Sequence, residues 1–344
     1  MSLMKSFHWI WLALIISSLT PYLLQAQTNN YLNFAFDNPK LKSEFLLYLA
    51  KNYSSNAYSI LNKKTYDYYI GWVTGKGHYR VLSSYAVVVH ETCHLINEDI
   101  GGFWSKGYYI SPKIEIEVST TRIFKSNELN NMVPSDWKNK IFRYDAYING
   151  TGKDKEIASV AEGIYGLMDE FDAYYQSTRA VVELYGYYKT FAGYTEPYYW
   201  TLYLSNCYSS IFAYYEFRLF IAWYLKYARK NYPEIYQGII QNKKLKAAFT
   251  LIDISYEKVV KQYFENRKII LENINKAGRK KAEISDNYFI IVNKNQKGGT
   301  SKGYGIPDSE ITYLKSLFTL EDFQLLKLFS IENLNETNYE MYFN

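Results

Sequence analysis

The pattern of hydrophobic and polar positions changes character near the middle of the chain. In residues 113–123 apolar and polar side chains alternate, with Ile114, Ile116 and Val118 on one face, which predicts a β-strand. Beyond residue 150 the apolar side chains instead recur at helical spacing over long stretches. This spacing predicts helices at about 155–190, 198–230 and 233–275.

Shorter segments complete the predicted architecture. They are a helix at 39–51, strand-like runs rich in Tyr, Ile, Trp and Val at 66–73 and 78–82, strands at 108–110 and 288–292, and one or two helices beyond residue 307. Another helix is expected to begin near Tyr85, after the capping residues Ser83 and Ser84, and to end before Gly101. We therefore expect an α+β fold, mainly α, in which a small sheet precedes the helix that begins near Tyr85.

That expected helix carries the sequence HETCH, from His90 to His94, in a chain with only four histidines. On a helix, residues four apart project from one face about one turn apart, so both imidazoles can reach the same Zn²⁺. Glu91 then stands near the open coordination position. Residues 86–89 and 95–96 are apolar, so the helix should be largely buried. The alternative is a pair of buried neutral histidines without a metal.

A catalytic zinc site normally has three protein ligands, so HETCH needs one more. The third ligand is either His78, which lies just upstream, or a carboxylate on another helix. In the segment 155–190, Glu170 lies within a stripe of small side chains that would let a neighbouring helix approach closely: Ser159, Gly163, Gly166, Ala173 and Ser177. We expect Glu170 as the third ligand and Glu162 as the alternative. The stripe could also be a plain packing face in which Glu170 pairs with a buried Lys or Arg.

HETCH with a glutamate on a downstream helix resembles the zincin superfamily of metallopeptidases, and within it the gluzincins. The resemblance implies a zincin-like fold, with Zn²⁺ held by His90, His94 and Glu170. It also implies hydrolysis of a peptide or protein substrate, in which zinc activates a water molecule and Glu91 acts as the general base. The branch of zincins with a third histidine downstream is excluded, because no histidine follows His94.

A zincin-like reaction also needs a donor that stabilises the oxyanion. Tyr174 lies on the same stripe as Glu170 and is one candidate. The other candidate is His78. Cys93 lies inside the motif and is interpreted as a small buried core residue rather than as a ligand.

Composition suggests a competing function, the binding of peptide or glycan, and argues against the binding of nucleic acid. Aromatic residues make up 19% of the chain, with 38 Tyr, which could give a surface that holds peptide or glycan. The competing hypothesis is therefore a secreted, non-catalytic binding protein on a zincin-like scaffold, although a general bias toward Tyr would give the same count. The net charge of +5 is spread along the chain without a dense basic stripe, which excludes nucleic acid as a partner. A mean hydropathy of −0.29 argues against a polytopic membrane protein.

The first 26 residues match a secretory signal peptide, with Lys5, an apolar run over 7–19 and a small residue, Ala26, at the expected cleavage site. We therefore expect an exported protein without a membrane span after cleavage, periplasmic or extracellular. In an oxidising compartment Cys93 and Cys207 could pair, or each could be buried separately. The predicted divisions are the signal peptide 1–26, a mixed α/β subdomain with the HETCH helix 27–150, a helical subdomain 151–284 and a C-terminal extension 285–344.

Overall fold

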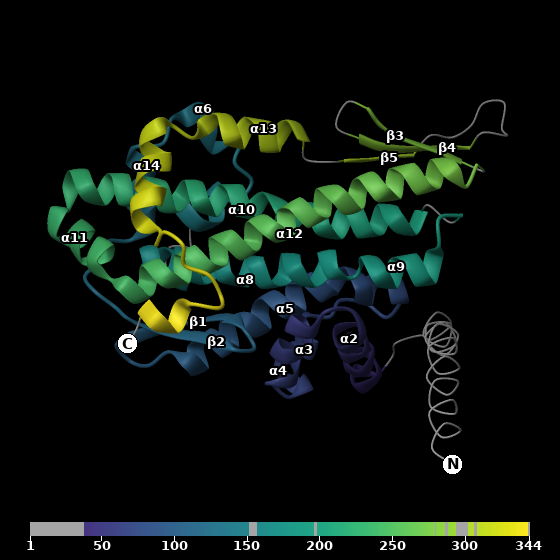
Figure 1. Cartoon of the computed structure of the whole chain (residues 1–344), viewed down its shortest axis with the longest axis horizontal. Coiled ribbons are helices and arrows are strands. Elements are labelled where there is room, and N and C mark those ends of the chain that lie inside the picture. Colours follow the sequence, from purple (N-terminus) through teal and green to yellow (C-terminus); the bar gives the residue numbers. More distant parts are fainter. Residues whose placement is uncertain are drawn as a thin grey trace, which may run out of the picture.

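Three long helices form the centre of the protein: α8 (Ile164–Glu183), α10 (Tyr198–Asn231) and α12 (Lys243–Lys276). They run side by side along the long axis of the molecule and pack against one another (Figure 1). The computed structural model describes residues 38–150, 157–195, 198–278, 280–285, 288–293, 302–305 and 308–342. Within these ranges the chain is mainly helical, with two small antiparallel sheets, as the sequence predicts for the fold class.

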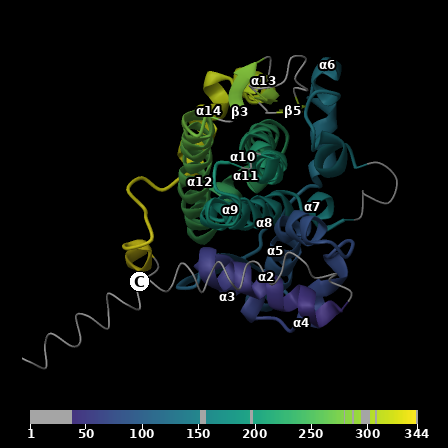
Figure 2. The same ribbon diagram turned by 90° about the vertical axis from the view of Figure 1, so that its right-hand side faces the viewer.

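The N-terminal elements form a layer on one side of the central helices (Figures 1 and 2). This layer contains α2 (Pro39–Tyr53), α3 (Ser55–Asn62), α4 (Tyr66–Tyr69), the 3-10 turn η1 (Ile70–Trp72) and α5 (His78–Ile100). Helix α5 packs against α8. A hairpin of β1 (Ser105–Ser111) and β2 (Ile114–Ser119) follows α5 and packs back against its end.

The remaining elements connect or cover the central helices. The connecting elements are η2 (Ser126–Asn131), α6 (Ser135–Lys138), the π-helical turn η3 (Asp145–Asn149), α7 (Ala158–Ala161), α9 (Tyr185–Ala192) and α11 (Pro233–Gln241). The covering elements are the sheet β3 (Lys280–Ser285), β4 (Tyr288–Asn293) and β5 (Lys302–Gly305), then α13 (Asp308–Leu317), α14 (Leu320–Phe329) and η5 (Tyr339–Tyr342). Helices α13 and α14 pack on α10.

The prediction of a sheet before the HETCH helix is wrong, because the two-stranded sheet follows that helix. Segments 66–73 and 78–82, predicted as strands, form α4, η1 and the first turns of α5. Their Tyr, Ile and Val content indicated strands, but strand propensity is weak and depends on context. Buried Val81, Leu82, Tyr85, Val88 and Val89 continue the helical pattern upstream of Tyr85 and place this segment on α5.

Most of the other predicted elements are confirmed. Helices are found close to 39–51 and 198–230, strands at 105–119 and 288–293, and two helices beyond residue 307. The segment 233–275 is helical with a break at Asn242. The segment 155–190 is divided at Gly163, whose φ of +57° a side chain rarely adopts. A Cβ there would lie 2.3 Å from the Phe124 carbonyl oxygen, so only glycine fits at the start of α8.

Tyrosines account for much of the core. One cluster of buried side chains extends from Phe45 to Leu334, and tyrosines are prominent among its largest fully buried members. Cys93 and Cys207 are both buried and do not form a disulfide with each other. Among the residues described above, no helix combines the length and the apolar composition that a membrane crossing requires. The predicted signal peptide lies outside the described residues.

Candidate metal centre

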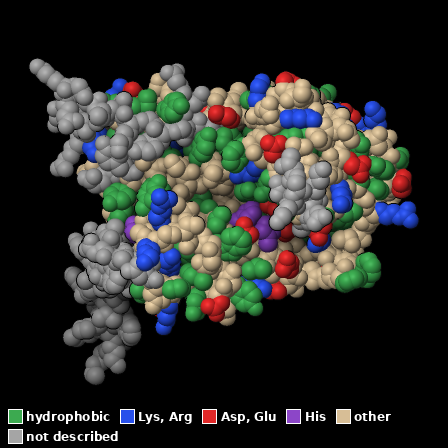
Figure 3. Space-filling view, turned by 180° about the vertical axis from the view of Figure 1, so that it is seen from behind, with side chains coloured by type: hydrophobic (Ala, Val, Ile, Leu, Met, Phe, Trp, Pro, Cys, Tyr) green, Lys and Arg blue, Asp and Glu red, His purple; other side chains and the backbone are tan. Residues whose placement is uncertain are grey.

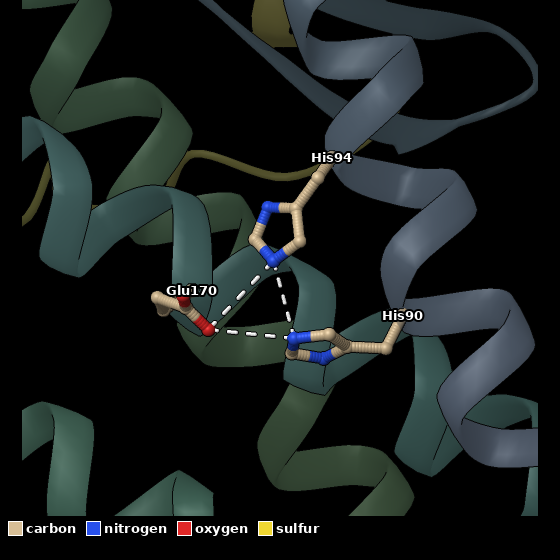
Figure 4. A group of neighbouring side chains, drawn as sticks. All are labelled: His90, His94 and Glu170. Atoms are coloured by element: carbon tan, nitrogen blue, oxygen red, sulfur yellow. Dashed lines mark hydrogen bonds and ion pairs between the residues drawn. The ribbon is translucent and has the colours of Figure 1, made fainter. Parts of the chain in front are cut away.

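The structure brings His90, His94 and Glu170 together where α5 packs on α8 (Figure 4). Their facing atoms form a triangle. His90 Nε2 lies 3.1 Å from His94 Nε2 and 3.4 Å from Glu170 Oε2, and His94 Nε2 lies 3.7 Å from the same oxygen. The interpretation in which Glu170 pairs with a buried Lys or Arg is wrong, because its charged neighbours within the described residues are these two histidines.

These separations match the donor set of a tetrahedral zinc site. With bonds of about 2.0–2.1 Å and tetrahedral angles, neighbouring ligand atoms lie roughly 3.3–3.4 Å apart. The measured sides of the triangle fall on either side of that length. Glu170 Oε2 is also buried without a hydrogen-bond partner among the described residues, which is costly for a carboxylate unless a cation faces it. Two imidazoles and a carboxylate are therefore a donor set suited to a divalent metal ion such as zinc.

A second carboxylate orients His94. Asp169 Oδ2 accepts a hydrogen bond from His94 Nδ1 at 2.7 Å, and its other oxygen accepts one from the Asn97 side chain at 2.8 Å. With its proton on Nδ1, the imidazole directs the Nε2 lone pair toward the ligand triangle. Carboxylates that hold a histidine in this way fix the ring and raise its basicity as a metal ligand.

The charges of the centre shift the pKa values of its members. Burial would raise the pKa of the Glu170 carboxyl, but its interactions with the nearby imidazoles of His90 and His94 hold that pKa well below its ordinary value. Burial would lower the pKa of His94, yet Asp169 and Glu170 hold it well above its ordinary value. A metal ion would have to displace the His94 proton, so metal affinity should rise with pH.

A pocket of about 330 Å³ gives access to the centre from outside. Its lining includes His94 and Glu98 from α5, Glu170 from α8 and Tyr147 from η3. Figure 3 shows histidine side chains in a depression near the middle of the face opposite to that of Figure 1, with acidic side chains beside them. Glu91 is partly exposed on α5, next to His90, and its carboxylate makes no hydrogen bond or ion pair with the described residues.

Two of the predicted site residues lie away from the centre. Glu162, the alternative third ligand, precedes α8 and forms an ion pair with Lys106 at 2.5 Å, so the break at Gly163 removes it from the face that carries Glu170. His78 begins α5 about 18 Å along the helix from His90, at 1.5 Å per residue. Its Nε2 contacts the hydroxyl of Tyr187 at 2.7 Å, so His78 does not serve the site.

The predicted role of Tyr174 as an oxyanion donor stays a prediction, and the structure adds Tyr147 as a second candidate. The Tyr174 ring packs against the His90 ring, with centroids 4.4 Å apart, while its hydroxyl is hydrogen-bonded to that of Tyr147 at 3.1 Å. Tyr147 lines the pocket, and burial first and the charge of Glu170 second raise its pKa. Tyr147 is therefore the better placed of the two hydroxyls for donating a hydrogen bond to a bound substrate.

Three residues at or beside the site received no role from the sequence patterns: Asp169, Tyr147 and Arg143, whose guanidinium carbon lies 4.3 Å from the centroid of the Tyr174 ring. Asp169 adjoins Glu170, and the adjacent pair of acids on α8 is a signal that could have identified it. Tyr147 and Arg143 lie in a segment without helical or strand periodicity, so no pattern indicated them.

Comparison of the chain with protein-family models, with curated proteins and with solved structures found no match. The resemblance to zincins thus rests on the HETCH motif and on the arrangement of His90, His94 and Glu170.

Proposed function

We propose that this protein is an exported zinc-dependent hydrolase that cleaves peptide bonds. The observation that carries the proposal is the triangle of His90 Nε2, His94 Nε2 and Glu170 Oε2, with sides of 3.1, 3.4 and 3.7 Å. These three residues would hold Zn²⁺. A zinc ion with three protein ligands and an open position acts as a Lewis acid toward a carbonyl and lowers the pKa of water.

We assign the other roles from the position of Glu91 in the motif and from the residues that line the pocket. Glu91 is adjacent to His90, partly exposed and without a partner among the described residues, so its carboxylate is available to take a proton from the attacking water. It would then deliver that proton to the leaving amine. Tyr147 faces the pocket beside Glu170, and its raised pKa keeps the phenol protonated, so it can donate a hydrogen bond to the developing oxyanion.

One observation favours the competing function, a binding protein that holds peptide or glycan through aromatic side chains. Phe103 and Trp104 are 90% and 77% exposed and contact each other edge to face, with ring centroids 4.7 Å apart. Exposed aromatic pairs of this kind are typical of binding surfaces. Because many of the tyrosines are buried in the core, the large Tyr count itself does not support this function.

The proposal is tested by measuring zinc content and peptidase activity in wild type, His90→Ala and Glu91→Gln. We expect one zinc per chain in wild type, loss of zinc in His90→Ala, and retained zinc with activity lowered by about 100-fold or more in Glu91→Gln, the scale of general-base catalysis. Wild-type protein without zinc would refute the metal site. Stoichiometric zinc without hydrolysis of any peptide in a mixed library would favour the binding protein.

A further inference from the structure

The two histidines of the metal centre are held in different ways at the ring nitrogen that points away from the ligand triangle, Nδ1. Its Nδ1 is buried and has no partner among the described residues, whereas Nδ1 of His94 contacts Asp169. Apart from the contacts of its Nε2 with His94 and Glu170, His90 is held by an aromatic contact. The Tyr174 ring meets it at a centroid distance of 4.4 Å and an interplanar angle of 61°, which is edge-to-face packing. The orientation of His90 therefore depends on where Tyr174 lies.

Tyr174 is in turn fixed by several neighbours. The guanidinium carbon of Arg143 lies 4.3 Å from the centroid of the Tyr174 ring, well within the range of a cation–π contact. Phe217 contacts the same ring, with centroids 5.3 Å apart, and Tyr147 holds its hydroxyl. Arg143, Tyr174 and His90 thus form a continuous stack that ends at a predicted metal ligand.

Arg143 is anchored to α10 by a buried ion pair. Its Nη1 donates to Glu216 Oε2 at 2.7 Å, its backbone N–H donates to Glu216 Oε1 at 3.1 Å, and its Nη2 donates to the carbonyl of Ser209. Arg143 is 5% exposed and Glu216 is fully buried. Burying two charges is expensive, and a hydrophobic pair could fill the same space at lower cost. A planar guanidinium can both pair with Glu216 and stack on Tyr174, which lysine cannot do.

We propose that Arg143 and Tyr174 are positioning residues for the metal centre, holding His90 in the orientation in which its Nε2 faces His94 and Glu170. The inference rests on the proposed zinc site, since it concerns how one ligand of that site is kept in place. The competing account is that the Arg143–Glu216 pair only fastens the η3 segment to α10 and contributes stability without affecting His90.

The chain offers a matched control for Arg143. Arg218, on α10 two residues from Glu216, also pairs with an acid, Asp253, at 3.0 Å and also lies over a tyrosine ring, that of Tyr214, at 5.1 Å. It has no contact with His90, His94 or Glu170 among the described residues. Arg143→Lys and Arg218→Lys therefore make the same chemical change, but only Arg143→Lys alters the stack of Arg143, Tyr174 and His90.

The experiment is a Co²⁺ titration of both variants and of wild type in the full chain, followed by visible absorption, with unfolding temperatures measured in parallel. We expect Arg143→Lys to bind Co²⁺ about 10–100-fold more weakly and to show altered absorption bands, the range seen for residues that support metal ligands. Arg218→Lys should bind as wild type does. An Arg143→Lys protein that binds Co²⁺ like wild type overturns the proposal, and so does an equal loss of affinity in both variants.

If Arg143→Lys does not fold, a second pair of variants tests whether the Tyr174 ring positions His90. Tyr174→Phe keeps the ring on His90 and should retain Co²⁺ affinity, whereas Tyr174→Leu removes the ring and should lower that affinity about 10-fold or more. Equal affinities in the two variants would refute positioning by the ring. Wild type that binds no Co²⁺ and no Zn²⁺ would remove the proposed function together with this inference, whereas a normal metal site in Tyr174→Leu would remove the inference alone.

Discussion

The two sides of the metal centre differ in the kind of contact that fixes the histidine. On the His94 side, Asp169 and Asn97 supply a chain of hydrogen bonds that ends at the imidazole. On the His90 side, the support is an aromatic ring backed by a cation. The HETCH spacing therefore places both imidazoles on one face of α5. The orientation of each ring depends on its neighbours, which are Asp169 for His94 and Tyr174 for His90.

The polar support on the His94 side extends into the core. Asn97 also donates to Asp172 Oδ2 at 3.1 Å, and the same carboxylate oxygen accepts from the backbone N–H of Tyr109 on β1 at 3.0 Å. Burial raises the pKa of Asp172 to about 7, despite hydrogen bonds from Gln176 and Asn97. The orientation of His94 is therefore tied to the packing of the hairpin on α5, whereas that of His90 is tied to α10.

Replacing Glu170 should have the largest effect, because it is the proposed ligand that faces both histidines. Glu170→Gln removes the anionic oxygen that faces both imidazoles, so we expect zinc affinity to fall by more than about 100-fold, beyond the range for residues that only support a ligand. The matched control is Glu162→Gln, which alters a carboxylate paired with Lys106 away from the centre. Calorimetric zinc titration of both variants measures the difference. Equal affinities would show that Glu170 is not a ligand.

Asp169→Asn should weaken the His94 side and leave the His90 side unchanged. We expect the maximal zinc affinity to fall about 10–100-fold, because the amide cannot hold His94 as a carboxylate does. The pH dependence should also shift. Asp169 helps to hold the pKa of His94 above its ordinary value, and below that pKa a proton competes with the metal. Without the Asp169 charge the pKa of His94 falls, so zinc binding should persist to lower pH.

The measurement for Asp169→Asn is zinc affinity across a pH series, beside wild type. The expected profile has a lower plateau at high pH and a midpoint shifted toward acid. A profile identical to that of wild type in both respects would mean that Asp169 does not act through His94.

His78 gives the smallest expected effect. It contrasts with His90 and His94, because its neighbours among the described residues are aromatic rings and include no carboxylate. Burial lowers its pKa from 6.5 to about 4, so between these values the unfolded chain binds a proton that the folded protein excludes. Wild type should therefore lose roughly 2 kcal/mol of unfolding free energy from this group between about pH 7 and about pH 4.5. His78→Phe should remove this part of the acid sensitivity. Urea unfolding at both pH values tests it, and an unchanged pH dependence would contradict the assignment.

Part of the candidate metal centre could be predicted from the sequence, because two of its residues are only four positions apart on one helix. Residues four apart on a helix share a face wherever the helix lies, so His90 and His94 could be paired from their spacing alone. Glu170 was chosen from a stripe of small side chains assigned to one helix; Gly166, Ala173 and Ser177 lie with it on α8, whereas Ser159 and Gly163 precede that helix. His78 and Glu162 were weighed by the same criteria and lie elsewhere, because the first turns of α5 and the break at Gly163 are set by packing and by backbone conformation.

The helical class of the protein, the HETCH helix and the pairing of His90 with His94 follow from the amino-acid sequence alone, whereas the grouping of Glu170 rather than Glu162 with them is decided by the tertiary structure. What surrounds the two histidines also depends on the tertiary structure: Asp169 on His94, Tyr174 on His90, and Arg143 behind Tyr174. Arg143 and Glu216 are 73 residues apart in the chain, so their contact depends on how whole helices pack. Which residues share a helix face depends only on the local backbone, so it can be predicted from sequence. Which side chains meet across the core depends on how the helices pack, so it needs the tertiary structure.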